Sequence, residues 1–215
     1  MPSLIRQQGI SLIEILVALA IGILLLGAAS SVGLTSLSSS KDGIINSNAQ
    51  QQLQIVMNSL TRELRRAGYS KSEETIQTAT GFRNIAFLDG NKCAVFRYDR
   101  LPESASALSP PGDGTLVNAE VRGIRLSGNQ IKIITAATST SMPTSCDDAG
   151  TWEDLSNSSL KITALTLTPL KVMLIDGSEV IDQVTVSITA ESKSTPVQNL
   201  SISEVVQLRN RPFAN

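Results

Sequence analysis

A long apolar run near the amino terminus constrains the fold of this chain more than any other feature. Residues 15–40 contain no charged side chain, and a helix needs about 20 predominantly apolar residues to cross the hydrocarbon of a bilayer. The run therefore predicts a membrane-spanning helix. The whole apolar stretch covers residues 9–37, and Glu14, near its start, is the one charge inside it. A carboxylate in hydrocarbon costs roughly 2.5–3.5 kcal/mol. We therefore expect a positive charge to compensate for Glu14.

The residues before the run predict its orientation. Residues 1–8 are polar and carry Arg6 close to the amino terminus, and positive charge is retained on the cytoplasmic side of a membrane. We therefore expect a single-pass protein with a cytoplasmic amino terminus and a translocated carboxyl-terminal part. A secretory signal peptide has a shorter apolar core followed by an A-x-A-like cleavage site. The run is longer than such a core, and no such site follows it.

The composition argues against an enzyme. The chain of 215 residues contains no histidine, which excludes a Ser-His-Asp relay, a Cys-His relay and a zinc site with histidine ligands. We therefore expect no enzymatic activity. We also expect no cofactor, no metal and no small-molecule substrate. The net charge of -1 and the aromatic content of 3% supply neither a basic field nor an array of stacking rings. We therefore do not expect DNA binding.

The two cysteines, Cys93 and Cys146, lie well after the apolar run and are too far apart for a C-x-x-C motif. In an oxidising compartment, we expect them to form one disulfide. Closing a loop of about 50 residues stabilises a fold by about 4 kcal/mol on the chain-entropy model. A functional thiol is the alternative, but neither histidine nor a further cysteine accompanies either residue.

A second helical pattern follows the apolar run. Residues 36–43 are polar and contain poor helix formers, so they are a candidate soft joint. From Ile45 to Ala67, apolar residues recur at spacings of three and four, which predicts an amphipathic helix. Gly68 stands where a glycine commonly follows a helix end. We therefore expect the helix to end at about Ala67.

The remaining sequence predicts an antiparallel sheet, so the expected fold class is α+β. Gly128 and Asn129 form a two-residue hairpin signal between two β-rich runs. Loops are expected at residues 102–114, which contain prolines and glycines, and at residues 138–157, which are rich in Ser, Thr and Asp. The predicted strands are residues 85–89, 94–98, 121–127, 130–136, 160–168, 182–190 and 200–208.

Two clusters of charged side chains have alternative interpretations. An acidic cluster in the second predicted loop offers oxygen ligands for calcium, but its spacing does not match an EF-hand, and a solvated loop is the better interpretation. A basic cluster at the predicted helix end fits the helix dipole, and phosphate binding is its alternative. The acidic cluster is Asp147, Asp148 and Asp154; the basic cluster is Arg62, Arg65 and Arg66.

The amino-terminal motif consists of Gly9-Ile10-Ser-Leu-Ile-Glu14 followed by the charge-free run. It resembles the leader and first helix of the type IV pilin superfamily. The resemblance implies that a prepilin peptidase cuts after Gly9 and methylates the new amino terminus at Ile10, where the family usually has Phe. It also implies that Glu14 pairs with the free amine of a neighbouring subunit during assembly. An uncut signal anchor, with Glu14 close to the headgroups, is the alternative.

A second segment narrows the resemblance to one subgroup. Residues 62–69, Arg-Glu-Leu-Arg-Arg-Ala-Gly-Tyr, are similar to the helix ending of PilW-type minor pilins, which include the prepilin-peptidase-dependent B proteins. The type II secretion pseudopilin J is a near relative. The implied domains are a leader at residues 1–9, a transmembrane helix at 10–37, its amphipathic continuation at 38–68 and a β domain at 69–215.

The resemblance implies a structural function. We expect a minor pilin that primes or caps a type IV pilus, with the prepilin peptidase, other pilins and inner-membrane lipid as partners. It would lie in the inner membrane with a periplasmic carboxyl-terminal domain and then at the pilus surface. The alternatives are a J-type minor pseudopilin of a secretion system and an uncut, membrane-anchored binding or adhesion domain.

Overall fold

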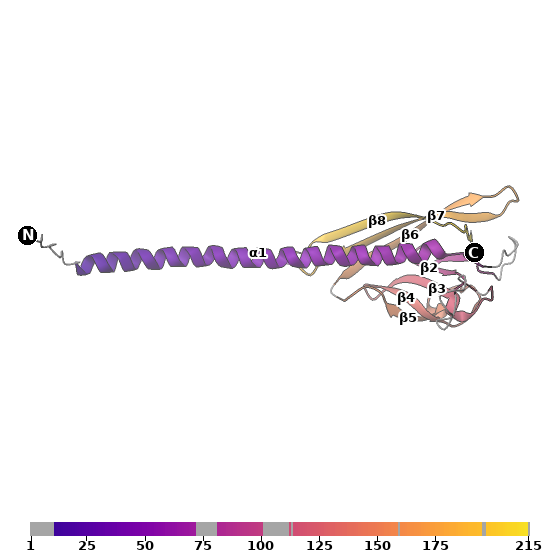
Figure 1. Cartoon of the computed structure of the whole chain (residues 1–215), viewed down its shortest axis with the longest axis horizontal. Coiled ribbons are helices and arrows are strands. Elements are labelled where there is room, and N and C mark those ends of the chain that lie inside the picture. Colours follow the sequence, from indigo (N-terminus) through magenta and orange to yellow (C-terminus); the bar gives the residue numbers. More distant parts are fainter. Residues whose placement is uncertain are drawn as a thin grey trace, which may run out of the picture. The chain divides into compact units, whose positions relative to one another are not determined.

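The computed structural model describes residues 11–71, 81–100, 112, 114–158, 160–194 and 197–214. It contains one long amino-terminal helix, α1 (Leu12–Arg66), followed by β-strands (Figure 1). The chain divides into two compact units, Met1–Ile44 and Ile45–Asn215. The predicted α+β class is confirmed, because an apolar helix is followed by a largely antiparallel sheet against which its carboxyl-terminal part packs.

In the first unit, the predicted soft joint is helical. Hydroxyl groups there donate hydrogen bonds back to main-chain carbonyls one turn earlier, from Ser38 to Thr35 at 2.9 Å and from Ser40 to Ser36 at 2.8 Å. Ser and Thr hydroxyl groups in helices often form this hydrogen bond to a carbonyl one turn earlier. The polar composition of this stretch therefore does not interrupt α1.

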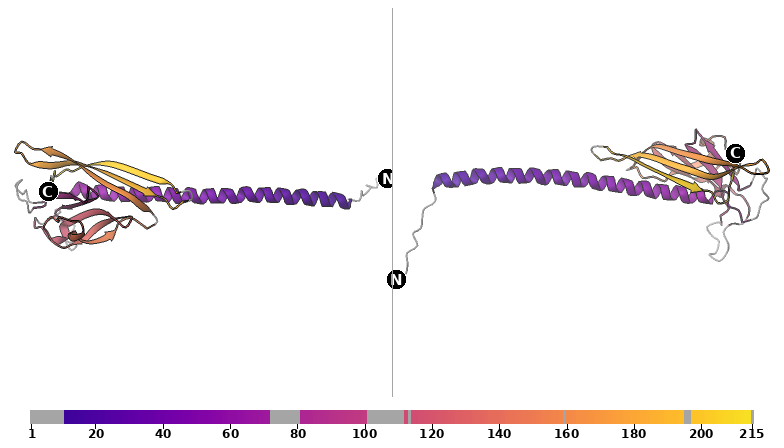
Figure 2. Two further views of the ribbon diagram at one scale, coloured as in Figure 1. Left: turned by 180° about the vertical axis from the view of Figure 1, so that it is seen from behind. Right: turned by 90° about the horizontal axis from the view of Figure 1, so that it is seen from above.

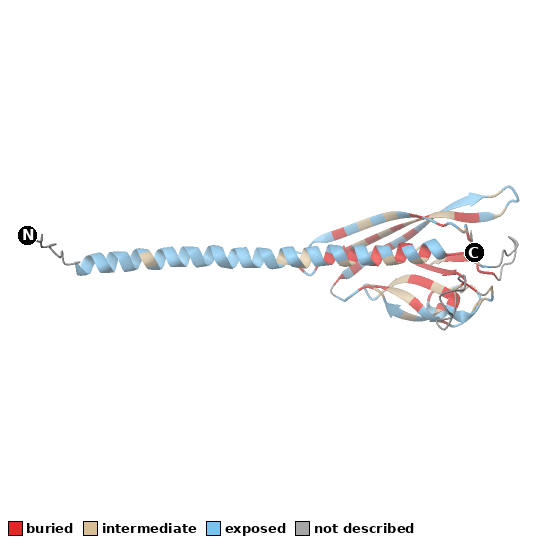
Figure 3. Cartoon of the chain, in the orientation of Figure 1, coloured by how far each residue is buried: buried red, intermediate tan, exposed pale blue. Residues whose placement is uncertain are grey.

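In the second unit, the predicted amphipathic pattern becomes the helical part of the core. Figure 3 shows that the buried residues of α1, in red, lie in its carboxyl-terminal part. They form an apolar stripe along the helix, and Ile55, which lies off this stripe, is 66% exposed. Burying an aliphatic side chain contributes roughly 1.5–3 kcal/mol, so this stripe fixes the helix to the sheet. The buried residues of α1 are Ala49, Leu53, Val56, Met57, Leu60, Thr61 and Leu64.

The helix ends where the sequence predicts. The last helical residue is Arg66, and Gly68 has φ of +80°, the left-handed conformation that glycine adopts without strain. Asn210, which is distant in sequence, caps the helix end, because its side-chain amide donates to the carbonyl of Ala67 at 3.1 Å. The Gly68 N–H donates to the carbonyl of Arg97 at 2.8 Å, which joins the helix end to the sheet.

The described residues form one sheet of nine strands in the order β5-β4-β3-β2-β1-β9-β7-β6, with β8 also paired to β7. All pairings are antiparallel except the short pairing of β1 with β9. Figure 2 shows the sheet from behind and from above. The strands are β1 (Asn84–Leu88), β2 (Cys93–Arg97), β3 (Val121–Ser127), β4 (Gln130–Ala137), β5 (Gly150–Asp154), β6 (Lys161–Met173), β7 (Glu179–Glu191), β8 (Asn199–Gln207) and β9 (Phe213–Ala214).

The predicted hairpin between β3 and β4 is confirmed. Gly128 and Asn129 have φ values of +61° and +62°, and Ser127 lies opposite Gln130. Positive φ at both central residues is the requirement of a type I′ turn, whose twist matches that of the flanking strands. The short-range turn chemistry is therefore sufficient to place this register.

The prediction of a loop at residues 138–157 is wrong for residues 150–154, which form strand β5. Residues 150–154 pair with β4, and the indole N–H of Trp152 donates to the carbonyl of Cys146 at 3.0 Å. The short 3-10 helix η2 (Asp147–Ala149) precedes the strand. Strand β5 lies at the edge of the sheet and exposes most of its side chains. Its sequence is therefore polar and lacks the apolar alternation by which a strand is predicted.

Strand β6 is longer than predicted, because Pro169 does not end it. The Leu167 N–H points away from β7 and donates to the carbonyl of Asn91 at 2.8 Å. Pro169 lies two residues further along the same strand, so its nitrogen faces the same side, away from β7. Proline is tolerated on the edge of a sheet for this reason.

The Glu63 carboxylate joins the helix to the sheet through Tyr98 and Arg122, and it also lies near Arg66 of α1 itself. The Tyr98 hydroxyl donates to Glu63 at 2.8 Å, and the guanidinium groups of Arg122 and Arg66 lie 3.6 Å and 3.9 Å from the Glu63 carboxylate. The Glu63 side chain is only 16% exposed. The pattern of apolar residues gave no signal for this contact, which helps to set the rotation of α1 on the sheet.

Candidate functional site

The amino-terminal half of α1 presents large apolar side chains that the described chain does not cover. The most apolar stretch of α1 is entirely unburied. By length and composition, the helix can cross a membrane, and contiguous apolar exposure of this size marks an interaction surface. The exposed side chains are Leu12, Ile13, Ile15, Leu16, Val17, Leu19, Ile21, Ile23, Leu24, Leu25, Leu26, Val32, Leu34 and Leu37.

Glu14 lies in the first turn of this helix, where a carboxylate suits the positive end of the helix dipole. Its N–H donates to the carbonyl of Ser11 at 3.0 Å, so the chain is helical from the start of the described region. Among the described residues, no ion pair includes Glu14. The expected processing residues, Gly9 and Ile10, lie outside the described residues.

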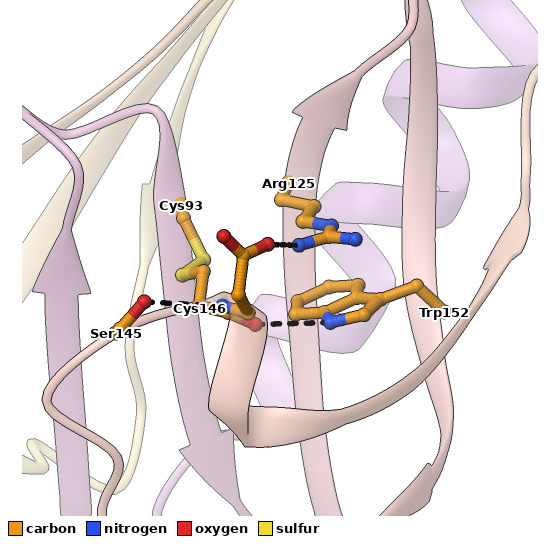
Figure 4. The surroundings of a disulfide bond; sticks show 6 residues. Cys93, Arg125, Ser145, Cys146 and Trp152 are labelled. Atoms are coloured by element: carbon orange, nitrogen blue, oxygen red, sulfur yellow. Dashed lines mark hydrogen bonds and ion pairs between the residues drawn. A yellow bond between two sulfur atoms is a disulfide. The ribbon is translucent and has the colours of Figure 1, made fainter.

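Cys93 and Cys146 form a disulfide in the structure, with their Cα atoms 6.6 Å apart (Figure 4). Cys93 begins β2, and Cys146 directly precedes η2. Both cysteines are buried in a small apolar cluster that includes Val95, Val121 and Ile134. The bond therefore fastens the segment before β5 to the centre of the sheet.

An aromatic and ionic cluster surrounds the disulfide. The Arg125 guanidinium lies 4.5 Å from the centre of the Trp152 ring and pairs with Asp147 at 2.6 Å. Figure 4 shows Trp152 beside Arg125 and the Cys146 carbonyl that receives its indole N–H. Stacking of a guanidinium on an indole contributes about 0.5–2 kcal/mol. The contacts are those of a structural element that holds η2 and β5 on β3.

Replacing both Cys93 and Cys146 with serine is expected to lower the free energy of unfolding by about 2–4 kcal/mol, because the unfolded chain regains the entropy of the open loop. Denaturant titration of the double variant against the oxidised parent measures the change. The parent treated with a reductant is the matched control and should lose a similar amount. Equal midpoints for all three proteins would contradict a structural role for the bond.

Two of the three acidic residues that suggested a calcium site have cationic partners of their own. Asp147 pairs with Arg125, and Asp154 pairs with Lys132 at 2.5 Å. Within the described residues, the group of side chains spaced for a metal is Asp89 with Cys93 and Cys146. Its two sulfur atoms are bonded to each other, and thiolates are the sulfur ligands that metals take.

The basic residues at the end of α1 line an open groove of about 490 Å³. Arg62, Arg65 and Arg66 come from the helix, and Arg209 comes from the segment after β8. Asn58, Thr61 and Glu204 complete the lining. The sequence indicated the helical arginines but not Arg209, which the fold brings to them from more than a hundred residues away.

Family models match almost the whole chain. The model of the prokaryotic N-terminal methylation motif matches residues 4–30. The model of prepilin peptidase-dependent protein B matches residues 43–208 and so covers the second compact unit almost entirely. No curated protein and no solved structure matches the chain.

The two matches agree with the structure. The methylation motif includes Glu14 and most of the exposed apolar half of α1, and the longer match includes the amphipathic half and strands β1 to β8. Both describe pilin-like structural proteins, and the apolar helix fits a membrane-anchored protein. The chain therefore belongs to the prepilin peptidase-dependent protein B family and is a type IV pilin-like protein.

Proposed function

We propose that this chain is a minor pilin, a structural subunit that primes or caps assembly of a type IV pilus and has no enzymatic activity. One observation carries the proposal: a single chain matches both the methylation motif and the B-family model, and it contains an apolar helical stretch that is not buried. In this proposal, residues 1–9 are the leader and 10–37 the membrane helix. Residues 38–68 continue the helix, and 69–215 form the periplasmic β domain.

The prepilin peptidase acts first in this scheme. It cuts after Gly9 and methylates the amine of Ile10, while the amino-terminal end lies on the cytoplasmic side of the inner membrane. Cutting removes Arg6 and places a new amine four residues before Glu14. The new terminus therefore carries a positive charge at the depth where the carboxylate needs one.

Assembly follows from the chemistry of the anchor. A helix that leaves lipid for a bundle of similar helices stays in apolar surroundings, so the hydrophobic effect neither drives nor opposes the transfer strongly. A pair between the Glu14 carboxylate and the Ile10 amine of another subunit can then set the axial position of one helix against the next. The partners implied are other pilins of the same filament.

The proposed processing predicts the amino terminus of the mature protein. When the full chain is produced in cells with a prepilin peptidase, mass spectrometry should find the mature chain beginning at methylated Ile10. Replacing Gly9 with a bulky residue such as valine should leave residues 1–9 in place, because the peptidase no longer accepts the site. Gly22→Ala is the matched control, since its added methyl group meets open space, and it should be cut normally.

The amino-terminal mass, together with co-purification and recovery in sheared pili, separates the alternatives. A chain that keeps Met1 in the presence of active peptidase would contradict the pilin proposal and favour an uncut anchored binding domain. A cut chain that co-purifies with secretion components and is missing from sheared pili would favour the J-type pseudopilin. Recovery of the cut chain in sheared pili supports the minor pilin.

A further inference from the structure

The open groove lined by Arg62, Arg65, Arg66 and Arg209, called the arginine groove below, lies wholly within the second compact unit. The exposed face of α1 supplies Asn58 and three arginines, and Glu204 on β8 lies across from Arg65, 139 residues away in sequence. The groove brings four guanidinium groups together with one carboxylate. A chain with net charge -1 therefore carries a local surplus of positive charge here.

Two of the four arginines have structural partners. Arg65 pairs with Glu204 at 3.2 Å, and Arg66 lies 3.9 Å from Glu63 and 5.8 Å from the centre of the Tyr98 ring. Both also lie in the last turn of α1, where the helix dipole favours cations. The stability of the fold is a sufficient explanation for these two side chains.

Arg62 and Arg209 lack such an explanation. Both are exposed, and among the described residues neither takes part in an ion pair. Arg62 lies one turn before the helix end, and Arg209 is not on the helix, so the dipole accounts for neither. The groove therefore presents two guanidinium groups that are free to bind an anion.

The lining favours carboxylates over a nucleic acid. It contains no aromatic ring on which a base could stack. Glu204 is 33% exposed inside the groove and would repel a continuous row of phosphates. Planar guanidinium groups match single carboxylates through paired hydrogen bonds, and Arg65 already binds Glu204 in this groove.

We propose that this groove binds an acidic segment, with at least two Asp or Glu side chains, on a neighbouring pilin subunit. The inference rests on the proposed function, because it names the chemistry of a contact within the filament. Exposed ion pairs are individually weak. Subunits held by their membrane helices meet at high effective concentration, so two weak pairs are enough to select a neighbour.

The test places a photo-crosslinking amino acid at Asn58 of the full-length chain in cells that assemble the filament. Asn58 lines the groove and is exposed and uncharged. Mass spectrometry of the product should identify a peptide of another pilin subunit that contains two or more acidic residues. Arg62→Glu with Arg209→Glu should lower the crosslink yield by about threefold or more, since attraction becomes repulsion.

Lys92→Glu with Lys193→Glu is the matched control. It changes the charge by the same amount at two exposed residues that do not line the groove, and the crosslink yield should be unchanged. Thermal unfolding midpoints of both double variants should equal that of the parent. A variant in which the partner's acidic residues become arginine should restore the yield of the Arg62→Glu and Arg209→Glu chain.

Three results would overturn the inference alone: a crosslink to nucleic acid, a crosslinked peptide without acidic residues, or an equal yield from both double variants. The proposed function is read separately, from recovery of the cut parent chain in sheared pili. If the parent is absent from pili, the proposed function fails and the groove inference fails with it. If the parent is present but the groove variants keep the crosslink, only the groove inference fails.

Discussion

Replacing Leu60 with alanine is expected to lower the free energy of unfolding by about 2–5 kcal/mol, the range for large aliphatic side chains in packed cores. Leu60 is 0% exposed and belongs to the core cluster that joins α1 to the sheet. Truncation removes apolar contacts and leaves a cavity. The helix cannot move to fill it, because buried residues before and after Leu60, such as Met57 and Leu64, hold it on the sheet. A change of this size is a large share of the stability of an ordinary domain.

Denaturant titration of the full chain in detergent measures this change through the unfolding of the second unit. Ile55→Ala is the matched control, because Ile55 lies on the same helix but is 66% exposed. It should change the stability by less than about 0.5 kcal/mol. Equal losses for the two variants would mean that the stripe of α1 is not the core face.

The parts of the fold that could be predicted from sequence are those with local signals. The run without charge, the stripe of α1 and the glycine after the helix end each depend on residues within a turn or two of one another. Gly68 illustrates this, because its φ of +80° follows from the absence of a side chain. The turn at Gly128 and Asn129 is specified in the same way.

The parts that were missed depend on long-range pairing. Strand β5 is short and mostly exposed, so it has no apolar pattern, and its place is set by β4 and by the disulfide segment beside it. Strand β9 has only two residues and is defined by pairing with β1 and β7. No periodicity within a segment reports such contacts.

The candidate site also has one part that could be predicted from local sequence and one part that could not. Glu14 could be singled out from sequence because a charge beside a long apolar run is costly wherever the helix packs. The arginine groove could not, because the pairing of β8 with β7 is needed to place Arg209 in the same groove as Arg62. The sequence therefore locates single residues with unusual local surroundings, whereas a surface made by distant segments needs the fold.

Replacing Glu14 with alanine is expected to have the largest functional effect. In the proposed filament, the variant leaves the methylated amine of a neighbouring Ile10 in apolar surroundings without a counter-charge. Removing one partner of a buried ion pair costs about 3–5 kcal/mol, and each 1.4 kcal/mol is a factor of ten in an equilibrium constant. Recovery of the chain in sheared pili should fall by at least about tenfold, even if relaxation of the helices recovers much of this cost.

Three measurements make the result specific to charge pairing. Glu14→Ala should still insert in the membrane and be cut after Gly9, because the variant helix is more apolar than the parent. Glu14→Gln retains the shape without the charge and should be nearly as defective, whereas Glu14→Asp should keep part of the incorporation. Ser31→Ala, another exposed polar position on the same helix, should assemble normally. Incorporation of Glu14→Ala at the parental level would show that this carboxylate does not hold subunits together.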